Sequence, residues 1–299
     1  TVLIPRAAPH PPLELFFTLA DGVLEGDLSA PGEEGIRVRG FRQAKSATPA
    51  SVAGRYNMPL RTVQSDAAYP LGTGHLSAVL SAQGAVNFSG KLADGTTLTG
   101  SGIPASGGEL PLHRMLYNNT GSIQGLLILD RGTPSFEAAL DWGKNTQAPD
   151  STRSYVAGFP VHDIGGGGGR YLPPATGQPV MGLPLLDNNA VLVFTEGGLA
   201  APFSQSLTFG AGNKVTLPAG AANPHQIRVT LNSATGLVTG TGKAMDIDPD
   251  NPGLNRQRQG SMSALIIQGE ARAEGYFLLP QDQGKTSPIW SGRVMLQAD

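Results

Sequence analysis

One phrase occurs twice in this chain, and each copy follows a stretch in which apolar and polar residues alternate. Residues 84–94 read GAVNFSGKLAD and residues 236–246 read GLVTGTGKAMD, and the two phrases align without a gap. The stretches before them, HLSAVLSAQ and QIRVTLNSAT, alternate up to a turn that ends in glycine. Alternation, a glycine turn and renewed alternation are typical of a β-hairpin. The repeat therefore predicts a chain built from a duplicated β-unit.

A second repeated phrase supports the duplication. Residues 121–128 read GSIQGLLI and residues 260–267 read GSMSALII, and each follows a copy of the first phrase. Valine, leucine and isoleucine recur at every second position over most of the chain, and no window has a convincing helical pattern. We therefore predict an all-β fold with almost no helix. It would consist of two related antiparallel modules, each a sandwich or a barrel, joined by a long extended connection.

The composition agrees with many short strands and tight turns. The 299 residues include 41 glycines and 24 prolines, and apolar residues make up 39%, as expected where each strand buries only one face. This length is enough for two β-domains with a core in each. There is no cysteine, which excludes disulfides, thiol catalysis and cysteine-ligated zinc.

We expect four segments along the chain. Residues 1–12 carry four prolines after VLI and predict an extended N-terminal arm, because proline prevents helix. Residues 13–145 are expected to form the first β-module and residues 185–299 the second. Residues 146–184 show little alternation and include the five consecutive glycines 165–169, so they are predicted to be the Gly/Pro-rich connection.

Charge and hydropathy restrict the partners and the location. A net charge of −2 argues against nucleic acid, which needs a concentrated basic surface. No apolar run approaches the roughly 18 residues that a spanning helix needs. A transmembrane β-barrel would alternate as well, but it would carry aromatic girdles, and aromatic residues are only 6% here. Low charge and abundant Gly, Ser, Thr and Asn are typical of exported bacterial surface proteins. We therefore expect an extracellular or cell-surface protein that has lost a signal peptide.

One acidic loop has the spacing of a cation site. Asp246, Asp248 and Asp250 alternate in DIDPDNPG, and Ca²⁺ prefers several hard oxygens from one short loop. The loop lacks the glycine and glutamate that an EF-hand requires, and Pro249 and Pro252 favour a simple acidic turn. Calcium is the one candidate cofactor, and a solvated turn is the alternative.

No local motif indicates catalysis. The histidines have no H-x-H or H-E-x-x-H spacing, and neither G-x-S-x-G nor S-x-x-K occurs. The five glycines are not followed by the Lys-Ser or Lys-Thr of a phosphate loop. Glu33 with Glu34, and Glu270 with Glu274, are the nearest carboxylate pairs for glycoside hydrolysis. Alternation places Glu270 and Glu274 on an exposed strand face, so we assign no catalytic residue and expect no enzymatic activity.

Two groups of residues are candidates for contact with partners. Val2, Leu3 and Ile4 form an apolar stretch that would add a strand to a neighbouring subunit, with a frayed terminus as the alternative. Exposed aromatic rings on a sheet face would bind polysaccharide, and the plausible rings are Trp142, Trp290, Tyr117, Tyr155 and Tyr171. The two tryptophans lie near matching ends of the two halves, which favours core positions for them.

The chain resembles the Gly-rich β-modules at the C-terminal ends of large secreted proteins from planctomycete and verrucomicrobial bacteria. The resemblance rests on the repeated glycine–lysine phrase, on GSMSALIIQ leading into GYFLLP, and on SPIWSGRVML near the end. It also includes RYLPPATGQPVMGL and NNAVLVFTEGGL, and it covers most residues from about 50 onward. The resemblance implies an exported, surface-associated all-β protein, and it supplies no catalytic residues.

These observations favour a non-enzymatic extracellular structural or adhesive protein, a self-assembling subunit of a surface layer or filament. One alternative is a glycan-binding module of a larger secreted protein. A further alternative is a hydrolase whose site lies at the junction of the two modules, near His162 to Tyr171. The expected partners are other copies, other surface proteins or polysaccharide.

Overall fold

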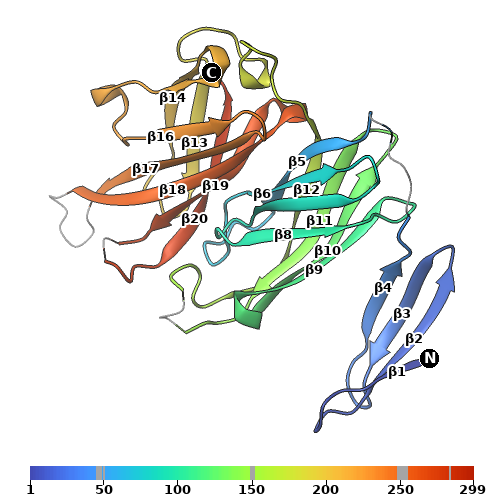
Figure 1. The fold of residues 1–299 in the computed structure, drawn as a ribbon. Helices are drawn as coiled ribbons and strands as arrows, with labels where there is room; N and C mark the ends of the chain where they lie inside the picture. The colour runs from blue at the N-terminus through green and yellow to red at the C-terminus, as the bar shows by residue number, and fades with distance from the viewer. Residues whose placement is uncertain (45–48, 50, 149–151, 248–254, 283) are drawn as a thin grey trace.

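The computed structural model describes residues 1–299 apart from 45–48, 50, 149–151, 248–254 and 283. Its described residues form three antiparallel sheets, one of four strands and two of eight. Figure 1 shows the two eight-stranded sheets as barrel-like bodies side by side, with the small sheet projecting away from them. The prediction of an all-β fold with two related barrel-like modules is confirmed.

The first barrel has the strand order β8-β7-β6-β5-β12-β11-β10-β9. Its open edges, β8 and β9, are consecutive in the chain. The strands are β5 (Gly54–Thr62), β6 (Gly74–Leu80), β7 (Val86–Lys91), β8 (Thr97–Gly102), β9 (Glu109–Leu116), β10 (Gly121–Asp130), β11 (Ser135–Lys144) and β12 (Phe159–Tyr171).

The second barrel has the order β15-β14-β13-β20-β19-β18-β17-β16. The strands are β13 (Ala190–Glu196), β14 (Phe203–Phe209), β15 (Val215–Thr216), β16 (Arg228–Asn232), β17 (Leu237–Ile247), β18 (Asn255–Ile267), β19 (Arg272–Pro280) and β20 (Ile289–Ala298). The helical segments of the described chain are single turns, η1 (Tyr117–Asn119), η2 (Val180–Gly182), η3 (Ala211–Asn213), η4 (Gly220–Ala222) and η5 (Gln268–Glu270). None of these described turns is long enough to cross a membrane.

The first 41 residues form a sheet of their own, which we call the N-terminal sheet. It contains β1 (Val2–Ile4), β2 (Leu13–Ala20), β3 (Val23–Ser29) and β4 (Ile36–Phe41), in chain order. The predicted boundary at residue 13 is therefore wrong, because β1 pairs with β2. The first barrel begins only at β5.

The five consecutive glycines lie in a strand, so the predicted connection 146–184 is wrong in its middle. They belong to β12, which pairs with β11 on one side and β5 on the other. A Cβ atom on Gly165 would lie 2.1 Å from the Ala138 carbonyl oxygen of β11, and one on Gly168 would lie 1.9 Å from the Asn57 carbonyl oxygen of β5. Glycine is what allows both neighbouring strands to approach so closely. The crossing between the barrels is the shorter segment 172–189.

Both copies of the first repeated phrase form part of a β-hairpin, but the two hairpins occupy different positions in their barrels. Gly84 and Gly236 both have positive φ angles, 83° and 76°, where they end the turns of the β6–β7 and β16–β17 hairpins. However, β7 is the third strand of the first barrel, whereas β17 is the fifth strand of the second. The second phrase does mark equivalent strands, because β10 and β18 are each the sixth of their barrel. The first phrase therefore marks a type of hairpin, whereas the second phrase marks equivalent strands of the two barrels.

Each barrel has its own core of inward-facing side chains. In the first, Trp142, Tyr56 and Phe136 are almost completely buried, and the Tyr56 and Phe136 rings meet edge to face at 5.0 Å. In the second, Phe209 and Leu192 have no exposed surface. Alternating inward positions on successive strands build such cores.

The two barrels are held together by hydrogen bonds through their outer faces. The Asn57 side chain on β5 donates to the carbonyl oxygens of Thr235 and Ile266, at 2.9 and 3.1 Å. The Thr73 amide donates to the Gly275 carbonyl oxygen at 3.1 Å. Tyr276 of β19 is buried within the core cluster of the first barrel. These hydrogen bonds and this packing contact join the two barrels directly.

Candidate functional site

One face of the N-terminal sheet consists entirely of apolar side chains and glycine. Residues directly opposite one another on neighbouring strands point to the same side of a sheet. Val2 is opposite Leu15, which is opposite Leu28, which is opposite Ile36. The other rows on this side have the same character. The apolar face comprises Val2, Ile4, Leu13, Leu15, Phe17, Leu19, Leu24, Gly26, Leu28, Ile36, Val38 and Gly40.

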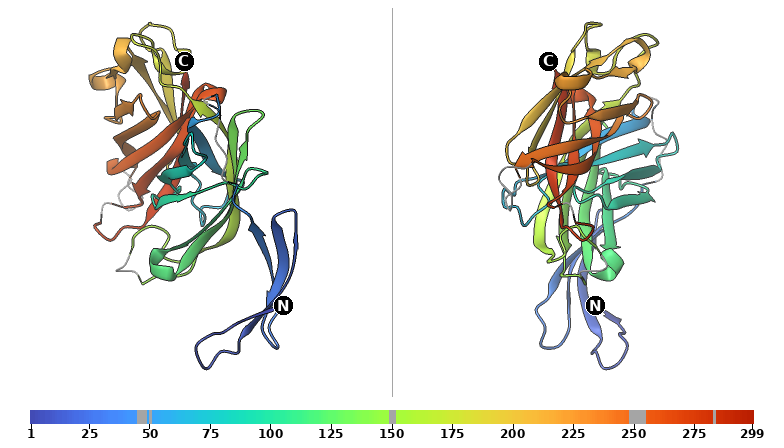
Figure 2. Two further views of the ribbon diagram at one scale, coloured as in Figure 1. Left: turned by 45° about the vertical axis from the view of Figure 1, so that its right-hand side comes forward. Right: turned by 90° about the vertical axis from the view of Figure 1, so that its left-hand side faces the viewer.

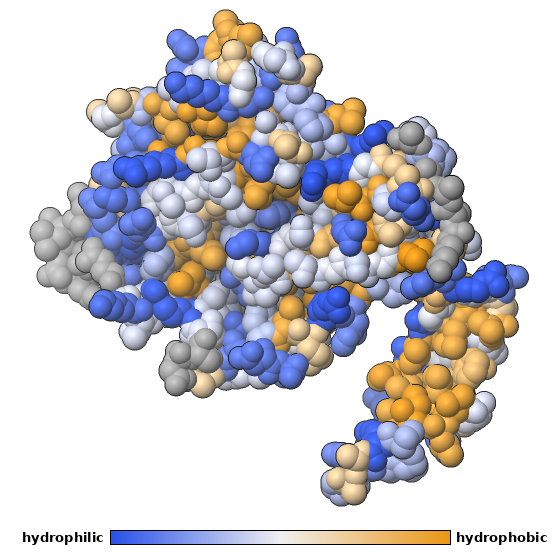
Figure 3. Space-filling view, viewed as in Figure 1, coloured by the Kyte–Doolittle hydropathy of each residue, from blue (hydrophilic) through white to orange (hydrophobic). Residues whose placement is uncertain are grey.

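The opposite face of the same sheet is mixed and charged. It holds two cross-strand pairs of opposite charge, Asp27 with Arg37 and Glu25 with Arg39. The Arg39 guanidinium lies 3.0 Å from the Glu25 carboxylate. The apolar residues that cover much of this sheet are orange in Figure 3. The pattern of β2 to β4 thus places all charged side chains of these strands on one side of the sheet, and only apolar side chains and glycine on the other.

The apolar face is exposed. Leu19 and Ile36 have 69% and 61% of their surface accessible. The sheet joins the barrels at the end of β4, where the Ala44 amide donates to the Pro104 carbonyl oxygen at 3.1 Å, and it projects from them in each view of Figure 2. A sheet with one apolar side needs a second layer on that side. The described chain does not supply this layer, so the apolar face is the candidate functional surface.

The predicted self-association residues lie in this sheet. Val2 and Ile4 belong to the apolar face, and Leu3 points to the opposite face. All three are exposed. β1 pairs with β2 of its own chain through Val2–Leu15 and Ile4–Leu13, and it forms one edge of the sheet. Strand addition to a neighbouring subunit stays a prediction.

Most of the candidate calcium loop lies outside the residues that the structure describes. Asp246 lies in β17, opposite Arg256 of β18, whereas Asp248 and Asp250 lie outside the described residues. Within the described ranges, no three histidine, cysteine, aspartate or glutamate side chains gather closely enough to hold a metal ion. Calcium binding stays a prediction.

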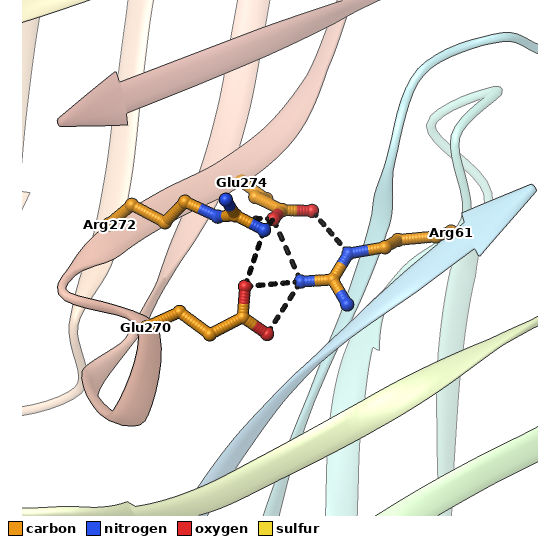
Figure 4. A network of polar contacts seen from close by, with 4 residues as sticks. All are labelled: Arg61, Glu270, Arg272 and Glu274. Carbon is orange, nitrogen blue, oxygen red and sulfur yellow. Dashed lines mark hydrogen bonds and ion pairs between the residues drawn. The ribbon is translucent and has the colours of Figure 1, made fainter.

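The candidate carboxylates Glu270 and Glu274 belong to an ion-pair network between the barrels. Figure 4 shows Arg61 of β5 reaching both of them. Its guanidinium lies 2.7 Å from the Glu274 carboxylate and 2.6 Å from that of Glu270. Arg272 contacts the same two carboxylates at 2.7 and 2.5 Å. The prediction of an exposed strand face is wrong for Glu274, which is buried.

The two arginines keep the buried carboxylate ionised. Burial acts to raise the pKa of Glu274, but hydrogen bonds and charge from Arg61 and Arg272 outweigh it, so this pKa lies below its usual value. A general acid for glycoside hydrolysis needs a raised pKa. The network therefore acts as an electrostatic joint between the barrels.

Removal of Arg61 is expected to weaken this joint. We expect Arg61→Met to lower the free energy of unfolding by about 1–2 kcal/mol, because Glu274 stays buried with one cation fewer and Arg61 itself is partly screened by water. Urea titration followed by tryptophan fluorescence measures the change. Arg293→Met is the matched control, since Arg293 lies 3.8 Å from the Glu196 carboxylate and should cost less than about 0.5 kcal/mol. Equal losses in the two variants would contradict this assignment.

His162, the start of the proposed hydrolase segment, is buried in the first barrel. Its ring packs against Tyr69 and Trp142 at 4.9 and 5.4 Å between centroids. Burial lowers the pKa of His162, so the ring is neutral near pH 7. Among the described residues, its Nδ1 lies 3.3 Å from the Pro160 carbonyl oxygen and its Nε2 has no hydrogen-bond partner. No described acid or nucleophile is bonded to this histidine.

The candidate aromatic residues do not assemble an exposed platform. Trp142 is buried, and its indole N–H donates to the Tyr117 hydroxyl at 2.9 Å. Tyr155 and Tyr171 are also buried. Trp290 belongs to β20 and is 37% exposed. The core position predicted for the tryptophans is confirmed for Trp142 and wrong for Trp290.

The apolar face was missed as a site at the sequence level, although its signal was present. Alternation over residues 13–41 is visible in the sequence. Because the predicted first module begins at residue 13, its core is expected to cover these apolar residues.

Comparisons with known proteins give matches among solved structures. No family model matches the sequence, and no curated protein is significantly similar to it. A solved Bacteroides fragilis structure described as a "putative outer membrane protein" is 13% identical, covering 83% of this chain and 98% of that chain, with a TM-score of 0.21. A Nostoc punctiforme protein of unknown function from the DUF3598 family is 10% identical, covering 82% and 95%, with a TM-score of 0.17.

Proposed function

We propose that this chain is a self-associating structural β-protein, and that two copies pack through the apolar faces of their N-terminal sheets. The observation that supports the proposal is an uncharged apolar face on a sheet that the described part of its own chain leaves uncovered. Exposed apolar patches of this kind mark interaction sites. The extracellular location and the non-enzymatic role expected from the sequence belong to the same proposal.

A second copy fits this face because of its charge and shape. The face has no ionised group, so two copies bring no like charges together. Two sheets of identical twist pack face to face at about −30° and about 10 Å apart. A face that binds lipid headgroups would combine Lys or Arg with apolar residues, yet Arg37 and Arg39 lie on the other side of the sheet.

The size of the face sets the expected affinity. Four strands at about 4.8 Å spacing and seven residues at about 3.3 Å rise cover roughly 450 Å² per copy, or roughly 900 Å² together. Stable interfaces bury about 1,200–2,000 Å². We therefore expect a concentration-dependent dimer with a Kd in the micromolar range. Because the contact is isologous, it closes on itself, and a filament would require a second surface.

Two exposed positions on the apolar face test the proposal. Sedimentation equilibrium at roughly 100 μM, well above a micromolar Kd, should give a dimer for the unchanged protein. Leu19→Glu with Ile36→Glu should give a monomer, because each copy then buries two charges. Both side chains are mostly exposed within one copy, so the variant should keep its fold, which circular dichroism verifies.

The opposite face of the same sheet provides the matched control. Leu3 and Phe16 are 62% and 50% exposed there. The Leu3→Glu with Phe16→Glu variant should remain a dimer with the affinity of the unchanged protein. A monomer at every concentration for the unchanged protein, or the same monomer for both double variants, would refute the proposed interface.

A further inference from the structure

A cleft of about 830 Å³ lies between the outer faces of the two barrels. Its walls come from β5 to β8 of the first barrel and from β16 to β19 of the second. Hydroxyl groups line both walls, including Ser89, Thr97, Thr230, Thr239, Thr241 and Ser261. The Thr230 and Thr239 hydroxyls are 2.9 Å apart. A cleft of this size accommodates a short oligomeric ligand.

The cleft is positively charged. Arg55, Lys91 and Arg228 line it, and its described lining contains no acidic side chain. Arg55 donates to the Ser77 hydroxyl at 2.8 Å, and none of the three cations forms an ion pair with a described carboxylate. His75 also lines the cleft, and burial, with the charge of Lys91, lowers its pKa to about 4. The cleft therefore presents three cations near pH 7.

Two acidic residues that are close to lining residues in the sequence already have hydrogen-bond or ion-pair partners. Asp94 precedes the lining residue Gly95, but it is buried and accepts hydrogen bonds from the Tyr117 hydroxyl and the Thr96 amide, at 2.7 and 2.9 Å. Glu274 is held by the two arginines of the inter-barrel network. Neither compensates the cations of the cleft, which a bound anion would do.

The lining also restricts the kind of polymer. Tyr276 is the aromatic residue of the lining, and it is buried with its ring stacked on His75. Neutral sugars are generally held by exposed aromatic rings, which this lining lacks. Hydroxyl side chains donate and accept hydrogen bonds, as sugar hydroxyls do, and Arg and Lys bind carboxylates. The combination favours a sugar chain with carboxylates.

We propose that the cleft between the barrels binds an acidic polysaccharide, with its carboxylates on Arg55, Lys91 and Arg228 and its hydroxyls on the serine and threonine walls. This binding site is independent of the interface between N-terminal sheets, so either proposal can fail alone.

Titration calorimetry with a galacturonate hexamer tests the cleft directly. The acid hexamer should bind, and its affinity should fall as salt concentration rises. The fully methyl-esterified hexamer has the same sugar chain without charge, so it should bind at least about tenfold more weakly. A hexaglutamate peptide has the charge without the sugar, and it should also bind at least about tenfold more weakly.

Variants locate the binding. Lys91 and Arg228 are exposed, so Lys91→Gln with Arg228→Gln should leave the fold intact and lower the affinity for the acid hexamer by about tenfold or more. Lys214→Gln with Arg37→Gln is the control, since it removes the same charge outside the cleft. Equal binding of ester and acid, equal binding of hexaglutamate, or equal losses in both double variants would overturn the proposal. Absence of acid-hexamer binding would overturn it too.

Discussion

Gly168→Ala is expected to destabilise the first barrel by about 3 kcal/mol or more, whereas Gly167→Ala, one residue earlier, should change little. A Cβ atom at Gly168 would meet the Asn57 carbonyl oxygen at 1.9 Å and the Met58 Cα at 2.7 Å. Both are backbone atoms of β5, which cannot move without disturbing its pairing with β12. Overpacking that forces backbone to shift costs about 1–3 kcal/mol, and loss of strand pairing adds to it.

Neighbouring glycines of the same strand provide the control. A Cβ atom at Gly167 or Gly169 has no atom within 4 Å among the described neighbours, so alanine there should change the free energy of unfolding by less than about 0.5 kcal/mol. Urea denaturation of the three variants, followed by circular dichroism, measures the difference. Similar stability of all three would mean that β5 and β12 are not as close as described.

Acidification is the second large expected effect, and it acts through His75. The pKa of this buried ring is lowered to about 4 from an ordinary value of 6.5. Below pH 6.5 the unfolded chain binds a proton that the folded chain does not, so stability falls as pH falls towards 4. A difference of 2.5 units corresponds to about 3 kcal/mol lost between pH 7 and pH 4. Above pH 7 this group should have no effect.

His75→Gln isolates that contribution. Glutamine keeps a polar group for the Ser263 hydroxyl, which lies 2.8 Å from the His75 ring in the unchanged protein, but it does not titrate. The variant should therefore lose less stability between pH 7 and pH 4 than the unchanged protein, as measured by urea titrations at each pH. His113→Gln, at an exposed position, should keep the original pH dependence. Parallel pH profiles for all three proteins would disprove the role of His75.

Much of the fold could be predicted from alternation, because an antiparallel strand with one buried side repeats its pattern every two residues. The hairpins whose turns end at Gly84 and Gly236 follow from it. The same method failed for residues 165–169, since a strand of glycines has no side chains to alternate. That strand is specified by the closeness of β5 and β11, which the local sequence does not record.

The candidate sites were less predictable, for two physical reasons. The apolar face is a property of a layer, and alternation does not say which strands share a layer or whether another layer covers it. The cleft joins Arg55 and Lys91 to Arg228, more than a hundred residues away in the chain. Their meeting depends on how the barrels pack, through contacts such as Asn57 with Thr235.

The projection of the N-terminal sheet from the barrels has a consequence for binding strength. Two copies joined by their N-terminal sheets would carry their barrel bodies, and hence their clefts, at opposite ends of one particle. When a long polymer is bound in one cleft, its free part is present at a raised effective concentration near the second cleft. Such a dimer would bind a long polymer more tightly than a single copy does. Fragments too short to reach both clefts would dissociate readily.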